Sequence, residues 1–330
     1  MERMPSEIGI VVIGRNEGDR LTTCLQSALL QSPHVIYVDS GSTDGSVAFA
    51  RSQGIEVVEL DLSIPFTAAR ARNAGFARLL EQLPDLNYVQ FVDGDCALVE
   101  GWCDRALALL QANPSIAVVC GRRRERFPDA SVFNALCDLE WNTPIGEALA
   151  CGGDALMRIA ALQTIGGYNP VLIAGEEPEL CLRLRQQGWQ VMRIDQDMTW
   201  HDAQMLHLSQ WWRRSVRGGH AYAEVSWLHR HNPEGFWRKE SRRIWVWGAG
   251  IPLLSLTLLP ITQCWSGLLG LLYPLLLLKT FGQTHHRCSQ PLAAYYGLFC
   301  TLAKFPELQG QLWFHWNRIR GDRSTLIEYK

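Results

Sequence analysis

The sequence lacks any excess of positive charge and any regular arrangement of cysteines. Lys and Arg total 31 against 33 Asp and Glu in 330 residues, so bulk charge gives no support to a nucleic-acid partner. The ten cysteines include no Cys-x-x-Cys pair, which argues against a zinc site or a disulfide framework. Scattered thiols of this kind are typical of a reduced, cytosolic chain in which they are buried.

Repeats and an N-terminal apolar segment are missing as well. We find no internal repeat and no low-complexity segment. The first residues, MERMPSEIGIVVIGRNEG, contain no long apolar stretch before polar residues interrupt them, so we expect no secretory signal. The length suits one large domain with an extension, or two smaller domains.

A long uncharged run lies in the C-terminal third. No residue from Ile244 to Leu278 carries a formal charge, and Arg242, Arg243 and Lys279 bound the run. This pattern predicts association with a membrane. A buried helical hairpin in a soluble core is the alternative, because three prolines would interrupt a single straight span.

Residues 8–120 alternate short apolar runs with amphipathic ones. Runs such as IGIVVI, VIYVD and YVQFVD have the length of buried strands, and residues 21–32 place apolar side chains on one face of a helix. Strands separated by helices pair in parallel and form a sheet covered on both faces. After residue 121 the alternation weakens, and GRRRERFPDA (121–130) is predicted to be a mobile basic loop.

Polar clusters follow three of the predicted strands: GRNEG, DSGSTDGS and DGDC. Ligands bind beyond the carboxyl ends of strands in such sheets, so these clusters are expected to meet at one rim. Asp93 and Asp95 stand two positions apart, where extended side chains point the same way, and we expect their carboxylates to converge. A hard cation such as Mg²⁺ would offset their repulsion, whereas a solvated Asp-Gly turn is the alternative.

Two further segments offer polar groups for a ligand. Asp39 could hold a base or a ribose, although Ser42 or Asp44 could instead cap the following helix. Arg70 and Arg72 could pair with phosphate or with the acids, or could lie on a solvated helix face.

Taken together, these segments resemble the family 2 glycosyltransferases. VVIGRNEG, YVDSGSTDGS, ARNAG and FVDGDC occur in that family's order and intervals, and the resemblance continues through GGDALMRIAALQTIGGYNP and GEEPELCLRLRQQGW. It covers roughly residues 8–220 and implies an α/β chain with the GT-A fold, which is the Rossmann-like mixed sheet of nucleotide-diphospho-sugar transferases. We therefore predict a GT-A catalytic domain over residues 1–235 and C-terminal hydrophobic helices, associated with the membrane, over residues 236–330.

The resemblance implies an enzyme that moves a sugar from a nucleotide-sugar donor with inversion and with Mg²⁺ or Mn²⁺. We expect a hexosyltransferase type acting on a glycan or lipid-linked acceptor, at the cytoplasmic face of the plasma membrane, in cell-surface polysaccharide synthesis. One alternative is a sugar-phosphate nucleotidyltransferase of related architecture, although the glycine-rich basic loop of such enzymes is missing. A catalytically inactive membrane scaffold of the same fold is the other alternative.

Residue roles follow from the same resemblance. Asp93 and Asp95 match the Asp-x-Asp motif, with Asp95 the better candidate for direct metal contact, and His201 lies where some relatives place a metal or phosphate ligand. A lone histidine can also be purely structural. The expected contacts to the nucleotide sugar are Glu17, Asp39, Arg72, Asp93 and Gly153.

The catalytic base is expected in GEEPE, at a predicted helix start. The family usually has Glu-Asp here with the Asp as base, so alignment assigns this role to Glu177, which departs from the family by one methylene. Glu176 remains an alternative. Acids at a helix start are also favoured by the helix dipole alone, which would explain Glu176, Glu177 and Glu179 without catalysis.

Overall fold

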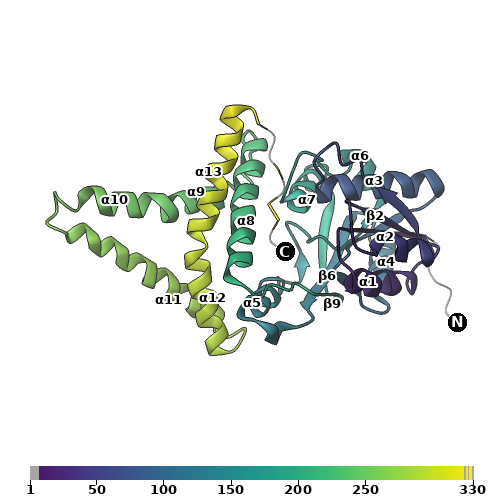
Figure 1. The fold of residues 1–330 in the computed structure, drawn as a ribbon, viewed down its shortest axis with the longest axis horizontal. Helices are drawn as coiled ribbons and strands as arrows, with labels where there is room; N and C mark the ends of the chain where they lie inside the picture. Colours follow the sequence, from purple (N-terminus) through teal and green to yellow (C-terminus); the bar gives the residue numbers. More distant parts are fainter. Residues whose placement is uncertain (1–6, 323–324, 326, 329–330) are drawn as a thin grey trace. The chain divides into compact units, whose positions relative to one another are not determined.

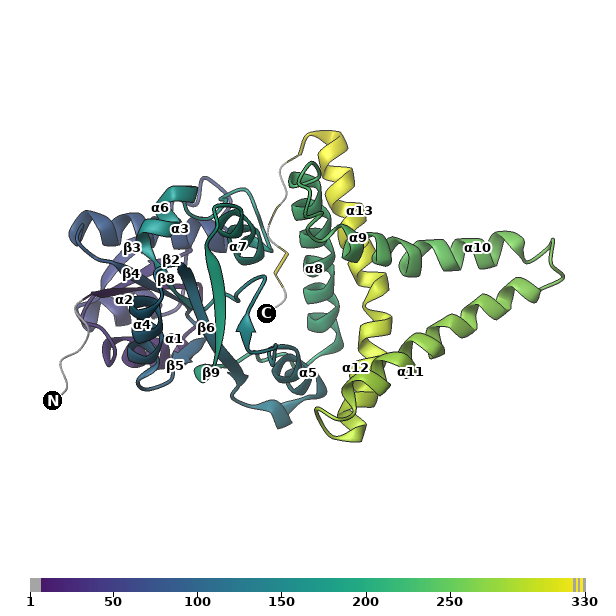
Figure 2. The ribbon, with the colours of Figure 1, turned by 180° about the vertical axis from the view of Figure 1, so that it is seen from behind.

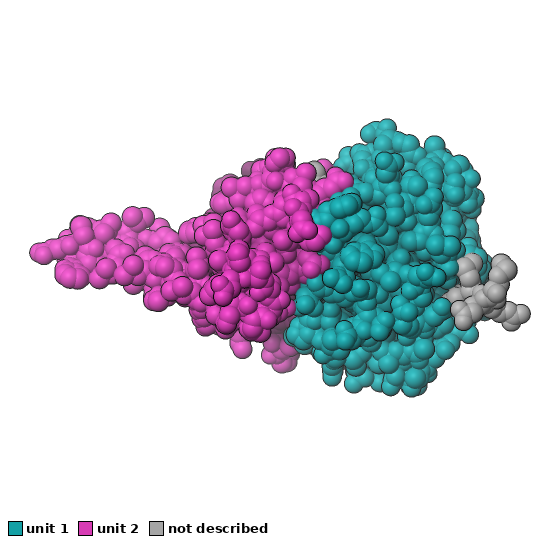
Figure 3. Space-filling model, turned by 90° about the horizontal axis from the view of Figure 1, so that it is seen from below, with its two compact units in different colours: residues 1–127, 140–203 teal, residues 128–139, 204–330 magenta. Residues whose placement is uncertain are grey.

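The computed structural model describes residues 7–322, 325 and 327–328. Residues 1–6, which belong to the segment expected to contain no secretory signal, lie outside this part. The chain divides into two compact units, coloured separately in Figure 3. Unit 1 comprises the described residues up to Phe127 together with Glu140–Ala203, and unit 2 comprises Pro128–Leu139 and the described residues from Gln204 onward.

Unit 1 is built on a nine-stranded mixed sheet (Figures 1 and 2). The spatial order is β3-β2-β1-β4-β8-β6-β9-β5, and β7 pairs with β9. The strands are β1 (Ile8–Gly14), β2 (Val35–Asp39), β3 (Glu56–Glu59), β4 (Tyr88–Asp93), β5 (Cys96–Leu98), β6 (Ile116–Glu125), β7 (Gly146–Glu147), β8 (Ala155–Arg158) and β9 (Gln190–His201).

The first four strands of the spatial order pair in parallel, as the alternation predicts. β8 then lies antiparallel between β4 and β6. β1, β2 and β4 are buried along almost their whole length. Continuous burial of apolar strands is typical of a sheet whose two faces are both covered.

Amphipathic helices cover this sheet. They are α1 (Asp19–Leu29), α2 (Ser46–Ser52), α3 (Ala68–Gln82), α4 (Trp102–Ala112), α6 (Ile159–Ile165) and α7 (Glu176–Gln186). In α1 the buried residues are Leu21, Cys24, Leu25 and Ala28, at the predicted spacings of three and four. α3 packs against β1 and β2, and α4 packs against β6 and β8.

The prediction of a mobile loop over residues 121–130 is wrong for the first half of this segment. β6 continues through Glu125 and pairs with β9, with register irregularities between Cys120 and Arg123. Bulged pairing with a strand distant in sequence leaves no periodic signal, which explains the error. Arg124 pairs with Asp197 of β9 at 3.4 Å.

Unit 2 is helical. It contains a 3₁₀ turn η1 (Pro128–Ala130), most of α5 (Val132–Glu140), α8 (Leu208–Leu228), α9 (Arg238–Trp245), a π-helical turn η2 (Val246–Gly250), α10 (Ile251–Leu258), a 3₁₀ segment η3 (Trp265–Leu271), α11 (Leu272–Thr284), α12 (Gln290–Leu302) and α13 (Lys304–Arg320). Gly219 of α8 and Gly310 of α13 lie where these two helices meet. Because α8 packs on α13, the compact units divide after Ala203. The limit of the catalytic domain at residue 235 remains a prediction.

Within unit 2, α10 and α11 form the limbs of an apolar arm (Figures 1 and 2). Trp265–Thr284 is long and apolar enough to cross a membrane by length and composition, and only 6% of its most apolar window is buried. Leu256 is 63% exposed, so the arm is not the buried hairpin of a soluble core. Pro252 and Pro274 lie in the first turns of α10 and α11, where a missing N–H is tolerated.

Candidate active site

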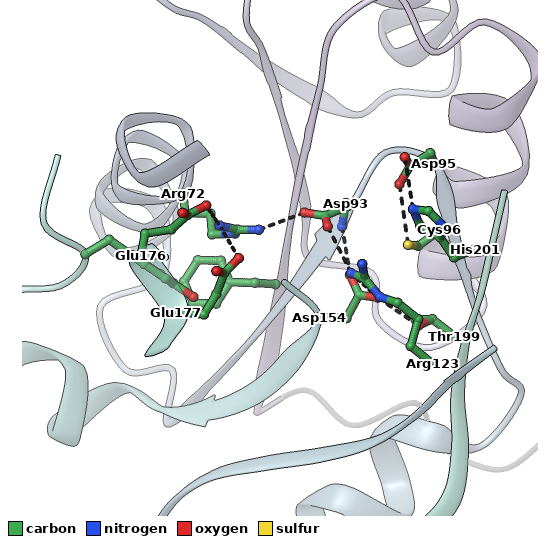
Figure 4. A network of polar contacts seen from close by, with 12 residues as sticks. Arg72, Asp93, Asp95, Cys96, Arg123, Asp154, Glu176, Glu177, Thr199 and His201 are labelled. Atoms are coloured by element: carbon green, nitrogen blue, oxygen red, sulfur yellow. Dashed lines mark hydrogen bonds and ion pairs between the residues drawn. The ribbon is translucent and has the colours of Figure 1, made fainter. Parts of the chain in front are cut away.

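Charged and polar side chains from several elements of unit 1 gather beyond the end of β4 (Figure 4). α3, α7 and the strands β4, β5, β6 and β9 each contribute, together with the turn after β4 and the segment before β8. The residues are Arg72, Asp93, Asp95, Cys96, Arg123, Asp154, Glu176, Glu177, Thr199 and His201.

Arg72 connects the predicted donor side of this cluster to the predicted catalytic acids. It is 2% exposed, and its Nη2 donates to Asp93 Oδ1 at 2.8 Å. Its Nη1 lies 3.0 Å from Glu176 Oε1 and 2.9 Å from Glu177 Oε1. A buried guanidinium needs such partners, because a buried unpaired charge is strongly unfavourable. The structure therefore brings together four residues that the sequence singled out.

Asp93 lies between two arginines. Arg123 Nη2 contacts Asp93 Oδ2 at 2.9 Å, opposite the contact with Arg72. Although burial opposes it, Arg72 and then Arg123 hold the pKa of Asp93 well below its usual range. The positive charge expected beside this acid is thus supplied by the protein itself.

Asp154 and Arg123 belong to the cluster but were not among the predicted site residues. Asp154 is fully buried and accepts from Arg123 Nε at 3.0 Å, from Thr199 Oγ1 at 2.7 Å and from the backbone N–H of Asp93 at 3.0 Å. The sequence signal for Asp154 was its place after two glycines and before an apolar run. Nothing in the sequence signalled its pairing with Arg123.

Asp93 and Asp95 each place a carboxylate oxygen within 4.8 Å of the Cys96 thiol, but they have different polar partners, because β4 ends at Asp93 and the alternation of side chains ends with it. Asp95 Oδ2 lies 3.3 Å from His201 Nε2, and its Oδ1 accepts from the Cys96 thiol at 3.5 Å. Asp93 contacts the two arginines instead. The two acids therefore have separate partners (Figure 4).

Asp95, Cys96 and His201 could hold a metal ion. One ligand atom from each lies within 4.8 Å of the others. Burial, above all, holds the pKa of His201 below its usual value, although a hydrogen bond with Glu125 opposes this, and a neutral imidazole is the form that binds metals. A carboxylate with an imidazole is a reasonable donor set for Mn²⁺ and a less typical one for Mg²⁺.

Glu177 has the electrostatic properties of a base. Burial, followed by the charge of Glu176, raises its pKa to about 7, while Arg72 acts in the opposite direction. A carboxylate that titrates near neutral pH is well suited to general base catalysis. Glu179 is not part of this cluster, because its carboxylate pairs with Arg183 at 2.8 Å.

Gly153 lies directly against the Arg72–Asp93 pair. A Cβ at this position would be 2.4 Å from Asp93 Oδ2 and 2.8 Å from Arg72 Nη2. Any side chain would therefore displace the two charged groups. At Gly152 a Cβ would meet nothing within 4 Å.

Glu17 lies in the loop after β1, and Asp39 is the last residue of β2. Asp39 is buried, and its carboxylate accepts from the backbone N–H groups of Gly41 and Ser42 and from the Tyr37 hydroxyl, each at 2.8 Å. Among the described contacts, neither acid pairs with the Arg72 cluster. The loop after β2 is anchored close to the end of its strand.

Contacts of the neighbouring loops bear on both acids. Glu17 pairs with Arg20 at 2.7 Å, and a Cβ at Gly94 would lie 3.3 Å from its Cγ, so Glu17 borders the turn after β4. Asp44 accepts from the backbone N–H of Ser46 at 3.0 Å, but the N-cap of α2 is Gly45 and no side chain caps this helix, so neither Ser42 nor Asp44 is its cap.

Comparison with known proteins adds to this geometry. The model of the family described as Glycosyl transferase family 2 matches residues 9–149. The succinoglycan biosynthesis protein ExoA of Rhizobium meliloti (strain 1021) is 26% identical over 177 residues, which cover 49% of this chain and 51% of that protein. The chain thus spans about half the length of this curated relative.

A solved structure shares the fold. The mannosyltransferase PcManGT from Pyrobaculum calidifontis, in complex with GDP-Man and Mn²⁺, superposes with a TM-score of 0.59. The match covers 94% of this chain and 88% of that one at 15% identity, which is evidence about the fold alone. With the mixed sheet, it confirms the predicted GT-A fold. Over residues 9–149 the chain is similar to glycosyl transferase family 2.

Proposed function

We propose that the chain is an inverting, metal-dependent glycosyltransferase. It moves a sugar from a nucleotide-sugar donor to a glycan or lipid-linked acceptor in cell-surface polysaccharide synthesis. The observation that carries this proposal is the position of Arg72, which contacts Asp93 at the end of β4 and Glu176 and Glu177 at the start of α7. The relative named for succinoglycan biosynthesis and the similar fold solved with GDP-Man and Mn²⁺ support it.

On the donor side, Asp39 and Glu17 bind the nucleoside. The Asp39 carboxylate is fixed by two backbone N–H groups, so it is oriented to accept from a base or ribose without rearrangement. Asp95 and His201 hold Mg²⁺ or Mn²⁺, with Cys96 beside them. When bound, the ion offsets negative charge on the departing nucleoside diphosphate as a Lewis acid.

On the acceptor side, Glu177 is the base. Its carboxylate takes the proton of the acceptor hydroxyl as the new bond to the anomeric carbon forms, while the bond to the leaving phosphate oxygen breaks on the opposite face. Arg72 holds Glu177 at 2.9 Å and so orients it. Glu176 contacts the same guanidinium and is the alternative base.

Membrane association is the third part of the proposal. The apolar arm of unit 2 inserts into the lipid, and the basic residues that bound it stay at the cytoplasmic face. An acceptor linked to lipid would then be presented at the surface where the enzyme is held.

The decisive experiment is a survey of nucleotide sugars with the purified full chain, with and without Mn²⁺ or Mg²⁺. We expect one donor to release its nucleoside diphosphate in a metal-dependent manner, and more rapidly with acceptor. Release of pyrophosphate instead would indicate a nucleotidyltransferase. Donor binding without turnover, under conditions that support a known family member, would indicate an inactive scaffold.

A further inference from the structure

A cleft of about 390 Å³ lies in unit 2 and is lined by residues of α9, η2 and α11. Four of its lining residues are apolar and two are cationic. The lining consists of Arg243, Trp247, Leu272, Leu275, Leu276 and Lys279. No acid lines this cleft, so its lining differs in chemistry from the acid-rich site of unit 1.

The two cations of the cleft are available to a ligand. Arg243 and Lys279 are both exposed, and within the described part of the chain neither forms an ion pair or a side-chain hydrogen bond. No residue between them in sequence carries a formal charge. The two positive charges therefore lie at the two ends of an apolar run and face one apolar wall.

The wall of the cleft is held in place by contacts within unit 2. The Trp247 ring packs edge-to-face on Tyr273 with centroids 5.7 Å apart, and the Tyr273 hydroxyl donates to the Trp247 carbonyl at 2.5 Å. Trp247 belongs to the π-helical turn η2, and such turns are frequent at functional sites. At Gly248 a Cβ would lie 2.6 Å from the Lys304 carbonyl oxygen, so this turn fits closely against the start of α13.

From these features we infer that the cleft binds an anionic membrane phospholipid. The phosphate headgroup pairs with Arg243 and Lys279, and an acyl chain lies on Trp247 and the leucines of α11. An aliphatic wall with two cations, and without other polar groups, suits an amphiphile better than a nucleotide or a sugar. The inference rests on the membrane association proposed above.

Quenching of tryptophan fluorescence by brominated lipids tests the inference. The full chain is bound to phosphatidylcholine vesicles that contain a small fraction of phosphatidylglycerol, and either lipid carries the bromine. We expect brominated phosphatidylglycerol to quench more than an equal fraction of brominated phosphatidylcholine. The excess should be missing in Trp247→Phe, because Trp247 is the tryptophan that lines the cleft.

Matched double variants separate the cleft from general attraction to a charged surface. Arg243→Gln with Lys279→Gln removes both cleft cations, whereas Lys239→Gln with Arg242→Gln removes the same charge from α9 outside the cleft lining. Removal of one cation at the lipid surface lowers the affinity for an anionic lipid by roughly fivefold. The double variant of the cleft should therefore have a preference for phosphatidylglycerol that is roughly 25-fold weaker than that of the unaltered chain. The excess quenching by brominated phosphatidylglycerol should remain in the double variant of α9. Loss of this excess to the same extent in both double variants would overturn the inference.

Sedimentation with pure phosphatidylcholine vesicles, measured alongside, reports membrane association by itself. Sedimentation without any preference for phosphatidylglycerol would overturn the lipid site alone. If the chain sediments with none of the vesicles, both the site and the proposed membrane association are overturned. Sugar transfer by the cleft variant in detergent should equal that of the unaltered chain, because the cleft residues are not part of the proposed catalytic machinery.

Discussion

Four carboxylates and two guanidiniums meet in the cluster around Asp93, and this imbalance governs what each acid can do. The acids are Asp93, Asp154, Glu176 and Glu177, and the arginines are Arg72 and Arg123. Four negative charges less two positive charges leave an excess of two. The raised pKa of Glu177 partly relieves this excess, because a proton on that residue removes one of the charges.

Replacing Glu177 by Gln should abolish transfer while donor binding and thermal stability are kept. Loss of a positioned base costs roughly 10² to 10⁴ in rate, whereas loss of a charge at a helix start costs only about 0.3–1 kcal/mol of stability. Turnover, donor affinity and melting temperature are the three measurements. Glu176→Gln is the matched control, since it contacts the same arginine. If Glu176→Gln loses transfer and Glu177→Gln does not, Glu176 is the base.

The pKa of Glu177 also predicts a pH dependence. As general base it must be ionised, so kcat/KM should rise with pH and level off above about 7. Its folded pKa lies above the unfolded value, so its stabilising contribution is complete below the unfolded pKa and is lost as pH rises through about 7. The melting temperature of Glu177→Gln should lack this decline. A kcat/KM profile that is flat between pH 5 and 8, a window centred roughly on this pKa, would contradict the assignment.

The proposed metal ligands make a separate prediction. Asp95→Asn should greatly increase the Mn²⁺ concentration needed for half-maximal turnover, because an amide oxygen is a weaker ligand for a hard cation than a carboxylate. Turnover is measured against Mn²⁺ concentration after treatment with a chelator. Asp154→Asn should mainly destabilise the fold, since Asp154 is buried against Arg123. Turnover by Asp95→Asn that equals the unaltered chain at limiting Mn²⁺ would exclude Asp95 as a ligand.

At the scale of helices and strands, glycines mark the places where backbones approach most closely. A Cβ at Gly219 of α8 would lie 1.9 Å from the Glu307 carbonyl oxygen of α13, and a Cβ at Gly310 would lie 2.0 Å from the Val216 carbonyl oxygen. Both contacts involve backbone atoms, which cannot rotate away as a flexible side chain can. The α8–α13 pair therefore depends on glycine at both positions.

Gly219→Ala should destabilise unit 2 by about 1–3 kcal/mol, because the added methyl group forces the two helices apart. Its neighbour Gly218 meets nothing within 4 Å, so Gly218→Ala should be neutral or slightly stabilising through its higher helix propensity. Urea denaturation of the two variants provides the comparison. Equal midpoints would show that α8 and α13 do not pack through Gly219.

The sequence determines local elements better than it determines their partners. β2 and β4 begin and end at the predicted residues, because VIYVD and YVQFVD are apolar runs with clear polar limits. The extension of β6 to Glu125 depends on bulged pairing with β9, which lies some seventy residues later in sequence and which no local pattern encodes.

The same limit applies to the candidate site. Rim positions such as Asp93 and Arg72 follow from strand ends and motif order, so they could be predicted. The contact of Asp93 with Arg123 joins elements far apart in sequence, and it could not be predicted, whereas the proximity of Asp95 and His201 agrees with the metal-ligand roles that the resemblance implies. A turn at Gly94 separates Asp93 from Asp95, so the two carboxylates have different partners. The spacing of the two residues in the sequence does not predict this turn of the backbone.

At the scale of the whole chain, many of the exposed large apolar residues that the structure describes lie in the helices of unit 2. In Trp265–Thr284, Leu268 is 53% exposed and Leu278 is 60% exposed. Soluble proteins rarely leave a continuous apolar helix in water, since such surfaces associate with a partner or a lipid. Pro274 lies at the third position of α11, where its missing N–H is tolerated, so it does not prevent insertion.

Leu268→Ser with Leu278→Ser should therefore release the protein from membranes without unfolding it. Burying a leucine side chain is worth about 1.5–3 kcal/mol, so the pair should weaken partitioning into phosphatidylcholine vesicles by at least roughly a hundredfold. Leu30→Ser with Leu149→Ser is the matched control, because these leucines of unit 1 are 76% and 63% exposed. Sedimentation with vesicles gives the partition coefficient, and circular dichroism confirms that both variants are folded. If the arm does not insert, both pairs will sediment alike, and the exposed leucines of α11 must then be covered by something other than lipid.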